Sequence, residues 1–215
     1  MDVRMFTVGP VQENSYLLRR EGATEALLVD PGDEAPRLLG TIDALGVDLK
    51  AILLTHCHFD HIGAVAPVAR ATGAPVYCPR GEVGILQDIM AYVPWPGFGP
   101  FESWDPEHTV SGGETLHLAG LEIEVVSTPG HSPDHVTYAL AGEAPPLLFS
   151  GDVLFQSSVG RTDLPGADHA TLMASIAVLL DRFDDETVVH PGHMGLTTLG
   201  RERASNPFLS ELTGS

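Results

Sequence analysis

The segment that most constrains this chain is residues 55–61, whose sequence THCHFDH holds three histidines and an aspartate within six positions. The four residues before it, Ala-Ile-Leu-Leu, are typical of a buried strand. Residues two apart in an extended chain point the same way, so His56 and His58 are predicted to aim at one point. Asp60 and His61 follow where the chain turns into a helix, and they are predicted to face a second point nearby.

Donors of these types indicate metal binding. Imidazole nitrogens and carboxylate oxygens suit zinc, iron and manganese, and a structural role does not readily explain four of them directly after a buried strand. Cys57 lies between two of the histidines, and the alternation of an extended chain points it away from them. The chain has one other cysteine, Cys78, and the two form no CxxC pair. We expect both to be structural thiols rather than a disulfide.

Three later segments each follow a strand-like run and supply a further donor. His131 comes after a Pro-Gly turn that follows the run at 122–126. Asp152 ends the apolar run at 147–150, and a carboxylate has two oxygens with which it can bridge two cations. His193 comes after a second Pro-Gly turn. We expect each of these side chains to be a metal ligand.

The predicted ligands form two triads and a bridge. The first triad is His56, His58 and His131, the second is Asp60, His61 and His193, and Asp152 joins them. The carboxylates of Asp60 and Asp152 are the predicted catalytic residues. His135 and His190 lie within strand-like runs, which favours supporting or packing roles over ligation, although direct ligation is the alternative for each.

Strand-like and helix-like segments alternate along the chain, which predicts layered α/β packing. Strands are expected at 4–8, 15–18, 26–29, 51–55, 75–77, 114–118, 122–127, 136–140, 147–150 and 187–189. Helices are expected at 34–45, 61–72 and 169–182, with Asp33, Asp60 and Asp168 as N-caps. Gly46 and Gly73 stand just past two of these helices, where a left-handed residue is favoured.

The bulk properties exclude several classes of function. A formal net charge of −18 with only 11 Lys plus Arg disfavours a nucleic-acid partner, which requires a basic footprint. No stretch approaches the roughly 20 apolar residues that span a bilayer. The first residues lack the basic start and apolar centre of a signal peptide. We therefore expect a cytoplasmic protein, and the absence of any linker predicts a single domain over 1–215.

The complete motif set resembles a known family. His-x-His-x-Asp-His at 56–61, Gly-His at 130–131, Gly-Asp at 151–152 and Pro-Gly-His at 191–193 are similar, in the same order, to the signature of the metallo-β-lactamase superfamily. The resemblance spans nearly the whole chain. It implies a four-layer αββα sandwich with two divalent metal ions at one edge of the sheets. Zinc is the first expectation, with iron and manganese as alternatives.

Within that superfamily the chain looks like the short, single-domain members of the glyoxalase II-like (hydroxyacylglutathione hydrolase-like) branch. The segments that carry this likeness are 128–133 (TPGHSP), 160–166 (GRTDLPG) and 206–209 (NPFL). The likeness implies a small thioester as substrate. A metal-bound hydroxide is expected to attack its carbonyl, because coordination lowers the pKa of water to about 7. A thiol of pKa about 8.5 then leaves without a strong acid.

Three departures from the family pattern bear on specificity. Glyoxalase II enzymes carry a C-terminal helical domain that helps to bind glutathione, whereas 22 residues follow His193 here, so glutathione specificity does not follow from the likeness. Met194 stands where glycine is usual, and a local change is expected. True lactamases of the superfamily commonly have cysteine where this chain has Asp152, which disfavours β-lactam hydrolysis.

Other functions remain as alternatives. The runner-up is a mononuclear iron persulfide dioxygenase on the same fold, which resembles the chain around His56, His58, His131 and Asp152. The intact second triad favours the hydrolase. A non-catalytic metal-binding module is disfavoured because all seven ligand positions hold competent residues. The acidic composition disfavours a phosphodiesterase or nuclease.

Three features outside the ligand set have two interpretations each. The segment 92–104 holds both tryptophans among prolines and glycines, and it is either a substrate lid or a loop packed on itself or against another subunit. A homo-oligomer is therefore left open. Arg161 either pairs with Asp163 within its loop or anchors a substrate carboxylate. Asp30 either supports a ligand or simply forms a turn.

Overall fold

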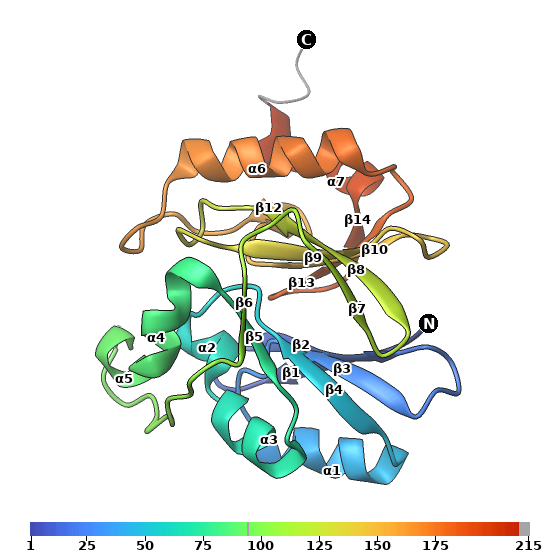
Figure 1. Ribbon diagram of the computed structural model, residues 1–215. Coiled ribbons are helices and arrows are strands. Elements are labelled where there is room, and N and C mark those ends of the chain that lie inside the picture. The colour runs from blue at the N-terminus through green and yellow to red at the C-terminus, as the bar shows by residue number, and fades with distance from the viewer. Residues whose placement is uncertain (94, 211–215) are drawn as a thin grey trace. The chain divides into compact units, whose positions relative to one another are not determined.

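The computed structural model describes residues 1–93 and 95–210, so Pro94 in the aromatic segment lies outside the described residues. Contacts between Cα atoms divide the chain into two compact units. The first unit is Met1–Val110 with His117–Leu121, and the second is Ser111–Leu116 with Glu122–Ser215. Each unit is built on a six-stranded sheet (Figure 1). The single domain expected over 1–215 stays a prediction.

The sheet of the first unit combines a hairpin with parallel strands. Its strands, in sheet order, are β1 (Asp2–Val8), β2 (Glu13–Arg19), β3 (Glu25–Val29), β4 (Asp48–Leu53), β5 (Val76–Pro79) and β6 (His108–Val110). The first three strands pair antiparallel, and β3 to β6 run parallel. The carboxyl ends of β3 and β4 therefore meet at one edge, and the metal-type loop 55–61 begins there.

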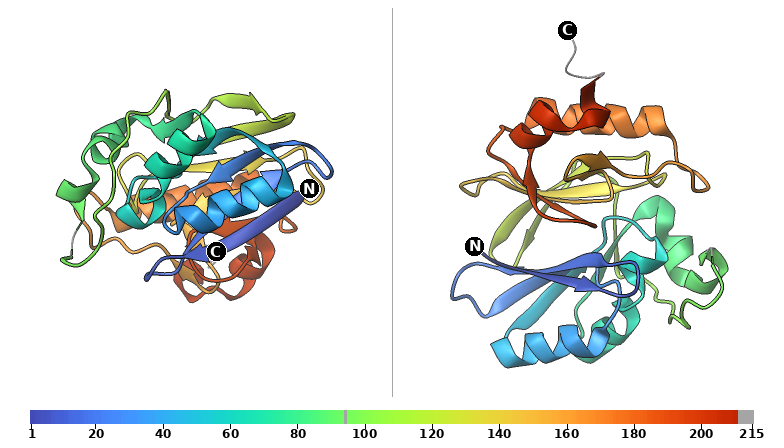
Figure 2. Two further views of the ribbon diagram at one scale, coloured as in Figure 1. Left: turned by 90° about the horizontal axis from the view of Figure 1, so that it is seen from below. Right: turned by 180° about the vertical axis from the view of Figure 1, so that it is seen from behind.

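Helices cover one face of this sheet. The helical elements are α1 (Ala35–Leu45), α2 (Phe59–Ile62), α3 (Val65–Thr72), η1 (Arg80–Glu82), α4 (Val83–Gln87) and α5 (Ile89–Tyr92). Seen from below in Figure 2, α1 and α3 lie side by side across the strands. The apolar side of α1 buries Leu38 and Ile42, and α3 buries Val65 and Val68 in the same core cluster. Burial of these apolar side chains holds the helices to the sheet.

The second unit has a mixed sheet of its own. Its strands, in sheet order, are β14 (Thr197–Thr198), β13 (Val188–Pro191), β10 (Leu147–Gly151), β9 (Val136–Leu140), β8 (Leu121–Ser127) and β7 (Thr115–Leu118). A short hairpin pairs β11 (Leu154–Phe155) with β12 (Ser158–Val159). The strands β10 and β13 run parallel, so Asp152 and the segment leading to His193 leave the sheet at the same edge.

Helix α6 (His169–Arg182) covers this second sheet, as Figure 1 shows. Apolar side chains of α6 and of its C-cap residue are buried in one core cluster: Leu172, Ile176, Leu179, Leu180 and Phe183. The chain then continues into α7 (Leu199–Ser205) and η2 (Pro207–Leu209). Glu202 of α7 is fully buried, and its carboxylate accepts hydrogen bonds from Ser157 N, Thr197 Oγ1 and Asn206 Nδ2. No described helix is long and apolar enough to cross a membrane.

The prediction of one continuous helix at 61–72 is wrong. The structure divides it into α2 and α3, with Gly63 between them. A β-carbon on Gly63 would lie 2.4 Å from the carbonyl oxygen of Gly32 and 2.7 Å from the ring of Phe101. The loop after β3 and the aromatic segment therefore press on the chain at this point, and tertiary packing overrides the helical pattern.

Two of the three predicted N-caps are also wrong. The N-cap of α1 is Glu34 rather than Asp33, and that of α2 is His58 rather than Asp60. The side chains of Glu34 and His58 make no capping hydrogen bond. Asp60 lies in the first turn of α2, where the helix dipole favours a negative charge. Asp168 is confirmed as the cap of α6, because its carboxylate accepts from the backbone N–H of Thr171.

Other elements were missed because they are short. These are β6, β11, β12, β14, the four-to-five-residue helices α4 and α5, α7, and the two 3-10 helices η1 and η2. Two-residue strands and single helical turns have too few positions for an apolar period to show. The strands that lead to the predicted ligands were all identified, within about three residues at their ends.

Gly32 offers a direct test of how the first unit shapes the metal-type loop. A β-carbon at Gly32 would lie 1.7 Å from the carbonyl oxygen of Asp60, which is a backbone atom that cannot rotate away. We expect Gly32→Ala to displace Asp60 and to lower the metal content of the purified protein severalfold. Elemental analysis of the variant checks this.

Gly40 provides the matched control, because a β-carbon there meets nothing within 4 Å and the residue is exposed on α1. Gly40→Ala is expected to keep wild-type metal content and to raise the free energy of unfolding by about 0.5–1 kcal/mol, the usual gain for alanine over glycine in a helix. Normal metal content in Gly32→Ala would contradict the close approach.

Candidate metal centre

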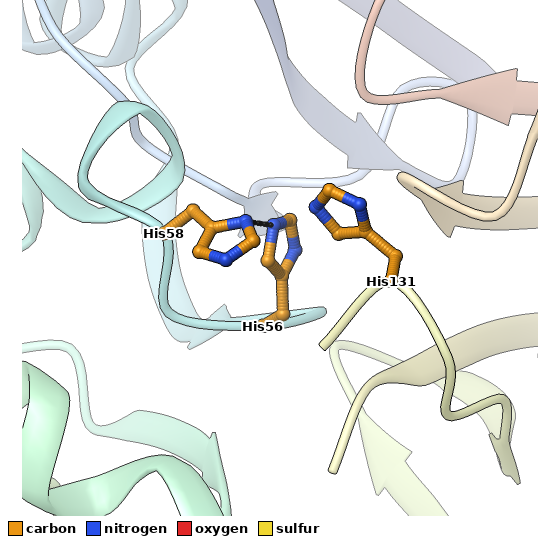
Figure 3. Close-up of side chains that lie close together, drawn as sticks. All are labelled: His56, His58 and His131. Carbon is orange, nitrogen blue, oxygen red and sulfur yellow. Dashed lines mark hydrogen bonds between the residues drawn. The ribbon is translucent and has the colours of Figure 1, made fainter. Parts of the chain in front are cut away.

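Four predicted ligands lie together on the loop that follows β4, and we call them the first half-site: His56, His58, Asp60 and His61. The backbone of His58 is extended, so His56 and His58 project toward one point, as their spacing predicts. Figure 3 shows their imidazoles with His56 Nε2 3.1 Å from His58 Nδ1. The ring of His61 lies 4.1 Å from that of His56, centroid to centroid.

Asp30 orients two of these histidines, and this is the role that the sequence left open. Its carboxylate lies 3.0 Å from His61 Nδ1 and accepts hydrogen bonds from the backbone N–H of Thr55 at 2.7 Å and from its hydroxyl at 2.6 Å. Because that hydroxyl donates to Asp30, its oxygen accepts from His56 Nδ1, 3.1 Å away. Both imidazoles therefore carry their proton on Nδ1, which leaves Nε2 as the ligand atom.

The backbone of Asp30 adopts an unusual conformation in this arrangement. Its φ of 45° lies in the left-handed region, which aspartate and asparagine tolerate better than most residues. Asp30, His56 and His61 each offer a ligand-type atom, and these atoms all lie within 4.8 Å of one another. All three side chains are buried, so the cluster is removed from bulk water.

Two glutamates that the sequence did not single out support the first half-site. Glu13 of β2 is fully buried, with Oε1 3.7 Å from His61 Nδ1, and burial raises the pKa of its carboxyl well above the ordinary value. The Glu82 carboxylate accepts a 2.6 Å hydrogen bond from the backbone N–H of Cys57. Their sequence neighbourhoods carry no metal-type motif, and only the three-dimensional packing reveals them.

The two cysteines behave as the expected structural thiols. Cys57 and Cys78 are fully buried, and their sulfur atoms lie 3.5 Å apart, well beyond a disulfide bond. Burial raises the pKa of the Cys57 thiol well above its ordinary value, which disfavours the reactive thiolate. Cys57 therefore packs behind the half-site instead of binding metal.

Three predicted ligands form the second half-site within the second unit: His131, Asp152 and His193. His131 Nε2 lies 3.4 Å and His193 Nε2 lies 3.6 Å from the same oxygen, Oδ2 of Asp152. His131, also drawn in Figure 3, donates from Nδ1 to the carbonyl oxygen of Arg161 at 2.9 Å. Its Nε2 is thereby the atom presented toward Asp152.

The donors of both half-sites fit metal ions. Nitrogen and oxygen ligands about 2.0–2.1 Å from a tetrahedral zinc lie about 3.3 Å from each other, close to the distances from Asp152 to its two histidines. His61 and His131 each give their second nitrogen to a carboxylate or a backbone carbonyl, as metal-binding histidines generally do. The donor set suits zinc, iron and manganese alike.

His135 and His190 take the supporting and packing roles expected of them. His135 Nε2 accepts from the backbone N–H of Asp152 at 3.2 Å, and its Nδ1 lies 3.0 Å from Thr128 Oγ1. His190 stacks on Phe149 with ring centroids 4.7 Å apart, and burial lowers its pKa to about 4. A neutral, stacked imidazole belongs to the core of the unit.

Two further expectations about loops have clear outcomes. Arg161 and Asp163 form a bidentate ion pair, with Nε 2.6 Å from Oδ1 and Nη2 2.8 Å from Oδ2. This confirms the predicted pairing within the loop. Met194 has a φ of 68°, a left-handed value that explains why glycine is usual after the last ligand. Its side chain is exposed, so the departure stays local.

A family profile and known proteins match this chain over most of its length. The profile described as the metallo-beta-lactamase superfamily matches residues 8–193. The hydroxyacylglutathione hydrolase GloC of Haemophilus influenzae is 34% identical over 212 residues, which are 98% of this chain and 99% of the relative.

Solved structures extend the likeness to the fold. The crystal structure of BLEG-1 B3 metallo-beta-lactamase is 40% identical, with a TM-score of 0.90 over 97% of this chain and 100% of that one. The structure of TTHA1623 in a di-iron-bound form is 43% identical, with a TM-score of 0.77 over 96% and 100% of the two chains. These likenesses confirm the predicted α/β fold class.

The role of Asp30 is testable by changing its charge alone. Asp30→Asn keeps the side-chain shape and the tolerance for a left-handed backbone, but its amide places a donor against Thr55 Oγ1 or His61 Nδ1. We expect metal affinity to fall about 10–100-fold, the usual cost of losing such a supporting partner. Competition with a chromophoric chelator measures the affinity.

Asp43→Asn, at an exposed position of α1, is the matched control and is expected to bind metal as the wild type does. Thermal unfolding of the metal-free proteins separates a folding defect from a loss of affinity. Wild-type metal affinity in a folded Asp30→Asn protein would show that Asp30 does not orient the histidines.

Proposed function

Because this chain belongs to the metallo-β-lactamase superfamily and has its fold, we propose that it is a dinuclear metal-dependent hydrolase that cleaves a small thioester. The observation that carries the proposal is the convergence of His131 Nε2 and His193 Nε2 on one oxygen of Asp152. A single carboxylate placed between two imidazoles suits a bridge between two cations. Each half-site alone supplies an incomplete set of ligands for such a pair.

The proposed ligand sets follow the two triads. His56, His58 and His131 hold one ion, and Asp60, His61 and His193 hold the other, with Asp152 shared. The relative TTHA1623, 43% identical, was solved in a di-iron-bound form, which supports a pair of ions and keeps iron beside zinc as the metal. Manganese remains compatible with the same donors.

The chain's residues have definable roles in the reaction. Bound metal ions would supply Lewis acidity and a water that is activated at neutral pH. The hydrogen bond from the Asp152 N–H to His135 fixes the backbone from which the Asp152 side chain extends. The side chain of Asp60 is 15% exposed, so its carboxylate can take up a proton and pass it to solvent.

A thioester is the substrate class that suits these residues. GloC, 34% identical over its full length, is named a hydroxyacylglutathione hydrolase. A thiol has a pKa of about 8.5, so a thiolate departs without a strong acid, and the two half-sites offer histidines that are oriented for ligation instead of proton donation. The proposed substrate is a small molecule in both its acyl part and its thiol part.

β-Lactam hydrolysis is a second candidate, because BLEG-1, 40% identical, is named a B3 metallo-beta-lactamase. The aspartate at position 152, where true lactamases commonly have cysteine, disfavours it. A nitrocefin assay run beside the thioester assay decides between them: turnover of nitrocefin at a higher kcat/KM than of any thioester would replace the proposal.

A persulfide dioxygenase with one iron is the alternative from the sequence. Its likeness to this chain lies around His56, His58, His131 and Asp152, whereas the intact second triad, which includes His193, favours the hydrolase. Oxygen consumption with glutathione persulfide, retained in His193→Ala, would favour it. We expect no oxygen consumption from the wild type and loss of hydrolysis in His193→Ala.

Asp152 gives the sharpest test of the hydrolase. We expect Asp152→Asn, which keeps the side-chain volume, to lose at least about 100-fold in kcat for S-lactoylglutathione and other thioesters, because a neutral amide cannot bridge two cations. Thioester turnover followed with a thiol reagent, together with metal content, measures this. Asp181→Asn, exposed on α6, is the control and should retain full activity. Wild-type turnover in Asp152→Asn would remove Asp152 from the mechanism.

A further inference from the structure

We propose that Glu202 is a positioning residue for the second half-site, because its carboxylate ties the hairpin that follows Asp152 to the strand that follows His193. The inference rests on the proposed function, in which Asp152 and His193 bind one metal ion together. It adds to that function a residue that lies outside the motif set. It concerns the second unit alone, to which all of these residues belong.

The hairpin β11–β12 contacts every member of the second half-site. It begins two residues after Asp152, and Gly160 follows its second strand. A β-carbon at Gly160 would lie 1.9 Å from the carbonyl oxygen of Asp152 and 3.3 Å from the β-carbon of His131. Phe155 of β11 meets the ring of His193 edge-on, with centroids 6.0 Å apart. Because packed interiors transmit small shifts, a movement of the hairpin would displace all three ligand-type residues.

The Glu202 carboxylate holds the turn at the far end of this hairpin. Its Oε2 accepts hydrogen bonds from the backbone N–H of Ser157 at 2.8 Å and from Asn206 Nδ2 at 2.9 Å. The same amide of Asn206 donates to the carbonyl oxygen of Ser158 at 3.0 Å. Ser157 has a φ of 59°, a left-handed value that serine seldom adopts. Such a conformation persists where its surroundings determine it, and Glu202 and Asn206 supply those surroundings.

The other oxygen of Glu202 reaches the segment that carries His193. Its Oε1 accepts a hydrogen bond from the hydroxyl of Thr197. Thr197 lies four residues after His193 and pairs with Val189 of β13, so it closes the turn that presents His193. One side chain therefore connects this turn to the hairpin. The 3.6 Å separation of His193 Nε2 from Asp152 Oδ2 depends on that connection.

Burial makes the connection rigid. Glu202, Thr197 and Asn206 are each at least 95% buried, so water does not readily replace a lost hydrogen bond among them. A carboxylate only accepts hydrogen bonds, whereas a glutamine amide has one accepting oxygen and a donating NH2 group. Glu202→Gln can keep all three contacts, because its oxygen accepts from Ser157 and Asn206 while its NH2 donates to the Thr197 hydroxyl. Glu202→Ala loses all three.

The test measures binding of cobalt(II), whose visible absorption depends on the number and geometry of its ligands. We expect Glu202→Ala to lower cobalt affinity about tenfold and to change the absorption spectrum, and Glu202→Gln to restore both. Supporting residues of metal sites commonly contribute 10–100-fold in affinity. The loss is expected near the lower limit because Glu202 acts through two segments instead of one ligand.

Thr197→Val cuts the link to the His193 turn alone. It preserves the side-chain volume and both hydrogen bonds of Glu202 to Ser157 and Asn206. We expect it to weaken the second cobalt ion, which His193 binds, about tenfold and to leave the first within twofold. This variant decides the question where Glu202→Ala does not fold.

Arg203→Gln is the matched control for a structural effect of α7. Arg203 lies on the same helix, and it donates to the Asp185 carboxylate at 2.9 Å and to the carbonyl oxygen of Leu180 at 2.7 Å. Neither contact involves the hairpin. We expect Arg203→Gln to lower the Tm of the metal-free protein and to keep wild-type cobalt affinity and spectrum. The same result in both Glu202→Ala and Thr197→Val would overturn the inference.

Thioester turnover, measured on the same proteins, separates this inference from the proposed function. We expect Thr197→Val to lower kcat about tenfold and to leave KM within twofold, because the ions move while the substrate surface does not. If the wild type binds two cobalt ions without hydrolysing any thioester, and the variants weaken the second ion, the hydrolase proposal fails and the positioning role is supported. A single cobalt ion in the wild type would contradict both.

Discussion

The carboxylate of Asp30 is the interaction on which the first half-site depends. It holds the N–H and the hydroxyl of Thr55 and faces His61 Nδ1, so one buried group sets the proton positions of two histidines. The left-handed backbone at Asp30 and the absence of a side chain at Gly32 let the loop after β3 reach this position. The carboxylate is buried, and its hydrogen-bond partners fix its orientation beside the histidines.

In the second unit, different groups orient the ligand-type side chains. The carbonyl oxygen of Arg161 fixes His131, and His135 fixes the backbone at Asp152. The ligand-type residues after β4, β10 and β13 leave their sheets at the carboxyl end of a parallel strand, where loops converge and strand packing anchors their first residue. His131 instead follows β8, which pairs antiparallel with β9. The rigid sheets position the donors, and the supporting hydrogen bonds choose which nitrogen each imidazole presents.

The sequence predicted the ligand-type residues better than the residues that orient and support them. His56 and His58 were recognisable because alternation along an extended chain is local, and His131, Asp152 and His193 because each follows a strand. Glu13 and Glu82 were invisible because they come from distant segments and carry no motif of their own. The division of α2 from α3 arises at Gly63 from packing against Gly32 and Phe101, which no local propensity encodes.

In our proposal the two half-sites together hold a pair of metal ions. Anomalous diffraction from crystals of the protein as purified, recorded across the absorption edge of the metal, tests it most directly. We expect two peaks per chain, one in contact with His56, His58 and His131, the other with Asp60, His61 and His193, and both with Asp152. One peak per chain, or peaks that Asp152 and His193 do not contact, would contradict it.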